Sequence, residues 1–352
     1  MVTVQRQSNI ELLRILCMFF VVMFHFNLNV ILRNGETSQG LNYMALLVNS
    51  LVVVAVNTFV LISGYFSIKI KMKSILSFLV QTEFYAVLAI VFYIIYSYVC
   101  STSVSKGIIL NLTPFNPIGL WFVPCYAMLL FISPLLNWIC KDKKAHFVVL
   151  TMVFARGVIL YILIGYEGYS IANFILMYLI GRWIALYPNK LTKMRSCWIT
   201  SLLIVSVCMT FVLALWWINR GHDIADKKIF AYSSPIVIMS SVLLFILFKN
   251  LTLSKQWINL VAPSVLSVYL FHENGLVKNF IYIKPLRHII AIVPSDFISY
   301  LCVVLYGLIL FAIVIIFDRF VRIKIQDMIV NALMNNIRVL KIIDSNLLKL
   351  NE

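Results

Sequence analysis

Apolar runs separated by short polar stretches follow one another along almost the whole chain. Ten of these runs are close to twenty residues long, the length that a helix needs to cross about 30 Å of hydrocarbon. We expect them to be transmembrane helices, with approximate bounds 10–31, 43–66, 75–99, 118–139, 146–165, 170–187, 198–218, 229–248, 257–277 and 297–317. The pattern therefore predicts an all-α fold, a polytopic transmembrane helix bundle of about ten spans.

The composition excludes a soluble protein. Hydrophobic residues make up 62% of the 352 residues and charged residues 12%, whereas a soluble domain is about half apolar and about one quarter charged. No polar stretch is long enough to form a separate aqueous domain, so we expect one membrane domain over residues 1–318. The seven cysteines are scattered through the chain without the spacing of a metal site. We interpret them as packing residues and expect no bound metal.

The distribution of basic residues predicts the orientation of the bundle. With the amino terminus inside, 20 of the 29 lysines and arginines fall on the inner side and 8 in outer loops, while Arg156 lies within a span. Because inner loops carry an excess of lysine and arginine, we expect both termini in the cytoplasm. The net charge of +16 then reflects membrane topology, and it does not require nucleic-acid binding.

The segment 319–352 follows the last predicted span. It places apolar residues three and four positions apart with basic residues between them, a pattern typical of a helix that lies on a membrane surface. We expect a basic amphipathic tail on the cytoplasmic side, without a catalytic role.

The first predicted span carries two polar residues on one face. In ELLRILCMFFVVMFHF (11–26), Arg14 and His25 are eleven positions apart, which brings their directions to within about 20° on a helix and separates them by a rise of roughly 16 Å. Glu11 precedes Arg14 by three positions and can pair with it. The face offers a cation near the cytoplasm and a titratable base farther in. The alternatives are a flanking arginine that reaches the interface and a histidine that only bonds a neighbouring helix.

A second pair of polar residues lies in YLFHENG, late in the ninth predicted span. His272 is about fifteen residues into this span, as His25 is in the first, so we expect the two imidazoles at a similar depth. Glu273 can orient a histidine or raise its basicity; the alternative is a cluster that caps a helix end at the interface. Glu83 and Arg156 lie deep in other spans, where we expect them to pair or to line a cavity.

The Arg-x10-His spacing on a first transmembrane helix resembles the acyltransferase 3 family of integral membrane acyltransferases. Three further stretches are similar to segments of that family: NTFVLISGYFS (57–67), GLWFVPCYAMLLFISPLL (119–136) and SVYLFHENGLV (267–277). The resemblance covers residues 9 to about 320. It implies ten spans and an enzyme that acylates a bacterial surface polysaccharide or another acceptor.

The resemblance also implies where the acyl donor binds. Family members often carry an Arg-x-x-Arg pair after the second or third helix, thought to hold coenzyme A phosphates. This chain instead has SIKIKMKS (67–74), with Lys69, Lys71 and Lys73, and lysine binds phosphate as a point charge without the bidentate fork of arginine. The expected donor site is Arg14 with these three lysines. The alternative is that the lysines only set the topology.

These observations predict a multi-pass acyltransferase of the bacterial inner membrane, an O-acetyltransferase of a surface polysaccharide or its lipid-linked precursor. Acetyl-coenzyme A would be a substrate, with no tightly bound cofactor, and the partners would be the acceptor and membrane lipid, not nucleic acid. His25 would act as general base, and the candidate catalytic set also includes Arg14, Glu11, His272 and Glu273. An acetyl-histidine relay is an alternative mechanism.

A transporter or flippase of a polysaccharide precursor is the alternative class of function. The buried charges would then line a pathway, and no acyl group would be transferred. Many transporters show paired interrupted helices in two halves of the chain, and this sequence has no such pair.

Overall fold

The computed structural model describes residues 7–101, 108, 112–113, 119–187, 190–224 and 226–350 of the chain. All regular secondary structure in these residues is helical. Seven of the described helices are long and apolar enough to cross a membrane, and there are two shorter apolar helices, Ile171–Leu186 and Pro235–Lys249. The predicted polytopic helix bundle is therefore confirmed.

The helices follow the predicted runs in order. Their bounds are α1 Ser8–Phe26, α2 Gln39–Val52, α3 Ala55–Phe66, α4 Met72–Val99, α5 Phe122–Ile139, α6 Lys143–Ile164, α7 Ile171–Leu186, α8 Ser196–Asn219, α9 Pro235–Lys249, α10 Gln256–Val261, α11 Val265–His272, α12 Lys284–Ile292, α13 Asp296–Phe317, α14 Ile323–Asn336 and α15 Arg338–Leu350. The ninth run is split, because a 3₁₀ turn at Ala262–Ser264 separates α10 from α11. α11 ends at His272, earlier than the predicted end at residue 277.

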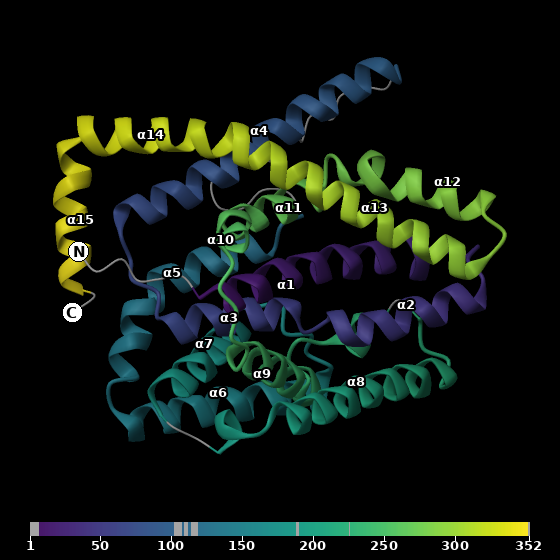
Figure 1. Cartoon of the computed structure of the whole chain (residues 1–352), viewed down its shortest axis with the longest axis horizontal. Helices are drawn as coiled ribbons and strands as arrows, with labels where there is room; N and C mark the ends of the chain where they lie inside the picture. Colours follow the sequence, from purple (N-terminus) through teal and green to yellow (C-terminus); the bar gives the residue numbers. More distant parts are fainter. Residues whose placement is uncertain are drawn as a thin grey trace.

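Both ends of the described chain lie on one side of the bundle. α1 begins toward the left of Figure 1, where α14 and α15 also lie. That this side faces the cytoplasm stays a prediction. Arg6 and Lys106, two of the basic residues behind that prediction, lie outside the described residues.

α1 is the central helix of the bundle. It contacts α2, α3, α9, α10, α11 and α13 and runs through the middle of the molecule (Figure 1). In the span that begins with α1, 67% of an apolar 18-residue stretch is buried inside the protein. In α6, the buried share of such a stretch is only 6%. The polar side chains of α1 therefore meet other helices, whereas α6 faces outward.

Two glycines allow α3 and α7 to approach closely. A Cβ atom on Gly64 would lie 2.2 Å from the carbonyl oxygen of Tyr178, and one on Gly181 would lie 2.2 Å from that of Leu61. Because only glycine fits such contacts, small residues let the two backbones touch. The close packing holds the end of α3 beside α1, where the donor site is expected.

The expected pair between Glu83 and Arg156 is not formed. Glu83 lies on α4, while Arg156 is exposed on the outward face of α6, with its guanidinium carbon 5.8 Å from the ring centre of Tyr166. The exposed position of Arg156 speaks against the pairing alternative. The period of a helix does not reveal which neighbour its charged residues meet, and the alternative that these charges line a cavity stays a prediction.

The tail begins inside the bundle. A π-helical turn at Asp318–Arg322 joins α13 to α14, and α14 and α15 both contact α4. Arg322 is 3% exposed, and its Nε donates to Asp318 at 2.7 Å. Tyr85 of α4 also donates to Asp318 at 2.9 Å. Arg322 is thus a buried partner of Asp318, which corrects the prediction that this basic residue belongs to a surface helix.

Candidate functional site

His25 and His272 meet in the interior of the bundle. The Nδ1 atom of His25 lies 3.0 Å from the Nε2 atom of His272, which confirms the predicted match in depth. His272 is fully buried, although it is the last residue of α11. The cluster therefore does end a helix, and this helix end is buried within the protein.

The hydrogen bonds assign the tautomer of both neutral rings. The Nδ1 atom of His272 is 2.6 Å from the carbonyl oxygen of Val268, and since a carbonyl only accepts, this nitrogen carries the proton. The Nε2 atom of His272 is then an acceptor, so the Nδ1–H of His25 donates to it. This arrangement leaves the Nε2 lone pair of His25 free to take a proton.

Glu273 completes the cluster as an anionic partner. Its Oε2 lies 3.7 Å from Nδ1 of His25 and accepts a hydrogen bond of 2.9 Å from the hydroxyl of Tyr282. The ammonium of Lys278 donates to Oε1 at 2.8 Å. The carboxylate is therefore held in place and can stabilise a positive charge that forms on His25.

Two π-helical segments bring further polar groups to this cluster. Asn27–Leu32 extends α1 directly after Phe26 and carries Asn29, whose amide donates to the hydroxyl of Tyr282 at 2.8 Å. Tyr282 belongs to the second segment, Asn279–Ile283. π-helical turns occur often at functional sites, and here they connect the end of α1 with Glu273.

The sequence alone did not identify Asn29, Tyr282 and Lys278 as site residues, although the residue spacing along α1 pointed to Asn29. His25, Asn29 and Arg33 are spaced four apart, the spacing of one helix face. Arg33 donates to the side-chain oxygen of Asn29 at 2.9 Å. Tyr282 and Lys278 gave no comparable signal, because they come from a segment that the span pattern treats as a loop.

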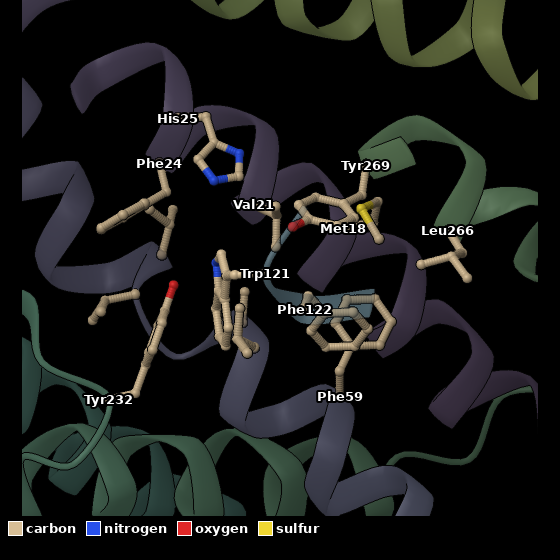
Figure 2. Close-up of a pocket in the computed structure, with 14 residues that line it drawn as sticks. Met18, Val21, Phe24, His25, Phe59, Trp121, Phe122, Tyr232, Leu266 and Tyr269 are labelled. Atoms are coloured by element: carbon tan, nitrogen blue, oxygen red, sulfur yellow. The ribbon is translucent and has the colours of Figure 1, made fainter. Parts of the chain in front are cut away.

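An apolar pocket adjoins His25 on the side that faces the start of α1. Figure 2 shows His25 at the edge of the pocket next to Phe24, with the rings of Trp121 and Tyr232 below it in this view. The pocket is lined by Met18, Val21, Phe24, His25, Val52, Val53, Ala55, Val56, Phe59, Trp121, Phe122, Tyr232, Leu266 and Tyr269. Trp121 thus lines a pocket inside the bundle.

A polar cavity of about 350 Å³ lies on the other side of His25. It shares His25, Phe24, Trp121 and Tyr232 with the apolar pocket and adds groups beyond the end of α1. These groups are Leu28, Asn29, Arg33, Gly119, Glu167, Tyr169, Glu273 and Lys278. His25 therefore stands between an apolar space toward the start of α1 and a charged, aromatic space toward its end.

The cavity wall includes a cluster of aromatic rings that contact one another, one pair stacked and the other edge to face. The ring centre of Trp121 is 4.6 Å from that of Tyr169 and 5.8 Å from that of Tyr232. Gly119 has a φ of +84°, which favours glycine, and it lies against the turn after α11. A Cβ atom added to Gly119 would lie 3.4 Å from the carbonyl oxygen of Glu273. The glycine therefore helps to place Trp121 beside the histidine cluster.

The predicted donor residues divide into two groups. Arg14 is partly exposed, lies 3.4 Å from the Glu11 carboxylate, and has its guanidinium 5.9 Å from the ring centre of Phe66, at the end of α3. Lys69 and Lys71 follow Phe66 and line a groove with Ile68, Ile70, Ser74, Ile75, Phe78, Tyr126 and Leu130. Lys73 instead donates to Asn331 of α14 at 3.3 Å. Donor binding by any of them stays a prediction.

Comparison with known proteins adds one finding to this geometry. No curated protein and no solved structure matches the chain. A family model described as an acyltransferase domain matches residues 7–317, which include α1 to α13 and every residue of the histidine cluster. The resemblance seen in the sequence is confirmed, and this multi-pass membrane protein belongs to the acyltransferase 3 family.

Proposed function

We propose that this protein transfers an acetyl group from acetyl-coenzyme A to a hydroxyl of a cell-surface polysaccharide or of its lipid-linked precursor. Membership of the family supports acyl transfer in general. The observation that carries the proposal is the arrangement of His25, whose Nε2 lone pair is left free by the hydrogen bond to His272 at the junction of two pockets.

His25 acts as general base in the proposed step. The acceptor hydroxyl gives its proton to Nε2 of His25 while the oxygen attacks the thioester carbonyl. The carbon–sulfur bond then breaks, an ester forms, and the imidazolium returns the proton to the departing sulfur of coenzyme A. Glu273, 3.7 Å from the ring, stabilises the imidazolium between these events.

The acyl donor is expected from the side of Arg14. The guanidinium and the lysines of the groove supply positive charge for the phosphates of coenzyme A. The rise from Arg14 to His25 is roughly 16 Å along α1, a distance that the extended pantetheine arm covers. The apolar pocket beside His25 suits the acyl end of the donor.

The acceptor is expected from the opposite side. Aromatic rings such as Trp121 and Tyr169 offer faces on which the C–H side of a sugar stacks, and Arg33, Glu167 and Lys278 offer hydrogen bonds to its hydroxyls. The cavity that holds these groups lies beyond the outer end of α1 if the amino terminus is cytoplasmic. This arrangement supports an acceptor at the outer face of the membrane.

Acetyl-coenzyme A turnover by the purified protein in detergent tests the proposal. We expect thiol release that requires a sugar acceptor and that disappears in His25→Ala, but not in the control His222→Ala, which changes an exposed histidine. The surface polysaccharide of a strain that lacks this protein should lack base-labile esters that the polysaccharide of the parent strain carries. Unchanged ester content would count against a polysaccharide acceptor, and acceptor-independent thiol release would count against transfer.

A further inference from the structure

Three ligand atoms of the kind that bind transition metals converge at the centre of the bundle. Nδ1 of His25, Nε2 of His272 and Oε2 of Glu273 lie within 4.8 Å of one another. The two nitrogens are 3.0 Å apart, and the carboxylate oxygen is 3.7 Å from the first of them. We propose that these three atoms bind a divalent transition-metal ion such as Zn²⁺, and that the ion inhibits the acyl transfer proposed above.

The three atoms are close enough for side-chain movement to bring them to the spacing of a metal site. Zn–N bonds are about 2.0–2.1 Å and Zn–O bonds about 2.0–2.2 Å, so ligand atoms at tetrahedral angles lie roughly 3.3–3.4 Å apart. The two imidazole nitrogens must separate by a few tenths of an ångström, and the carboxylate oxygen must approach His25 by a similar amount. The carboxylate must also close what remains of a separation from His272 that is at most 4.8 Å. The fourth position faces the polar cavity that His25 and Glu273 line, where a water molecule can complete the shell.

The partners of these groups already orient them as metal ligands. A histidine that binds a metal usually donates its other ring N–H to a carbonyl or carboxylate, as His272 does to Val268. Ligating carboxylates are in turn hydrogen-bonded, as Glu273 is by Tyr282. Lys278 holds the other carboxylate oxygen, and Oε2 keeps a second lone pair for a metal beside its hydrogen bond from Tyr282. The positive charge of Lys278 opposes the binding of a cation.

Metal binding and base catalysis exclude each other at His25. A metal on Nδ1 forces the remaining ring proton onto Nε2, the atom that would accept the proton of the acceptor. The same metal replaces the hydrogen bond between His25 and His272, because it occupies both of the nitrogens that form this bond. The inhibition therefore rests on the proposed function, whereas the binding itself does not.

A calorimetric titration of the full-length protein in detergent with Zn²⁺ tests whether the site binds the ion. Exposed thiols at Cys100, Cys197 and Cys208 are alkylated first, and His222→Gln/His288→Gln serves as the background because both of these histidines are exposed. We expect one bound ion in this background. His272→Gln or Glu273→Gln should lower the affinity at least 10-fold, since even an outer-shell change costs 10–100-fold.

Lys278→Met provides a test that structural damage cannot imitate. Removal of the neighbouring ammonium should raise the affinity for Zn²⁺, whereas a distorted site would bind more weakly. Equal affinity in the background and in His272→Gln, or no saturable binding in the background, would overturn the site. Weaker binding in Lys278→Met would do the same.

The inhibition is measured separately. Zn²⁺ should abolish acceptor-dependent thiol release at concentrations that saturate the site, and a chelator should restore it. Full turnover by the zinc-loaded protein would overturn the inhibitory role and leave the binding site intact. If no acceptor supports turnover, the proposed function fails, and the calorimetric titration still decides whether the site exists.

Discussion

The two ends of α1 hold their functional groups in different ways. Near the carboxyl end of α1, the carbonyl of Val268 accepts a hydrogen bond of 2.6 Å from His272, which in turn accepts one of 3.0 Å from His25, so both rings are fixed. Near the amino end, Arg14 Nη1 is 3.4 Å from a Glu11 carboxylate oxygen, and 32% of the arginine side chain is exposed. One end of the helix is thus pre-organised, and the other is loosely held.

This difference matches two different chemical tasks. A general base acts through a lone pair that must point at the reacting proton, so its tautomer and direction have to be set in advance. A cation that receives a phosphate group from solution needs accessible donors more than a fixed direction, because it acquires its partners when the ligand binds. Substitutions near the carboxyl end of α1 should therefore change turnover, and those near its amino end should change donor binding.

His25→Ala should have the largest effect. Loss of a general base costs about 10²–10⁴-fold in rate, and we expect this loss in kcat for acceptor-dependent thiol release. Membrane insertion should be unaffected, because alanine is compatible with a buried apolar helix. A variant that kept more than half of the wild-type turnover would show that His25 is not the base.

His272→Ala should have the next largest effect. The ring of His25 would lose the acceptor that sets its tautomer. Changes in such supporting groups lower activity about 10–100-fold. His272→Gln should recover part of kcat, because its amide oxygen can accept from Nδ1–H of His25. The KM for acetyl-coenzyme A should stay the same in both variants; a rise in KM with constant kcat would place His272 in the donor site instead.

Arg14→Ala should weaken the binding of the donor. A hydrogen bond to a charged group contributes about 1.5–3 kcal/mol, so we expect the Kd for coenzyme A to rise by about 10- to 150-fold in calorimetry. Arg14→Lys should recover only part of the affinity, because an ammonium lacks the planar fork. Equal binding by wild type and both variants would reduce Arg14 to a residue that flanks the helix.

The lysines after α3 should show the smallest effects and should differ from one another. Lys71 lines the groove beside α3, and an exposed ion pair contributes about 0.2–1 kcal/mol, so Lys71→Ala should raise the KM for acetyl-coenzyme A by up to about fivefold. Lys73→Ala is the matched control, because this side chain bonds Asn331 of the tail. Identical KM values for the two variants would show that the groove does not bind the donor.

Much of this architecture follows from the sequence. The lengths of the apolar runs predicted the bundle, since the thickness of the bilayer sets the length of a span. The helical period placed Arg14 and His25 on one face, and counting residues from the same membrane side placed His25 and His272 at one depth, where their nitrogens are 3.0 Å apart. These predictions succeed because rise and rotation per residue are local properties of a helix.

Other features depend on how the helices are rotated and tilted against one another, which no local pattern contains. The carbonyl of Val268, not the sequence beside His25, selects the ring tautomer. Tyr282 and Lys278 reach Glu273 only because the chain after α11 folds back onto α1. Arg322 is buried against Asp318, although the sequence placed it in a surface tail. Arg156 lies on the outward face of α6, although the sequence placed it deep in a span. The sequence determined by itself which groups are present and at what depth, because helix geometry is local; the tertiary structure alone decided which atoms meet, because packing depends on residues that are far apart in the chain.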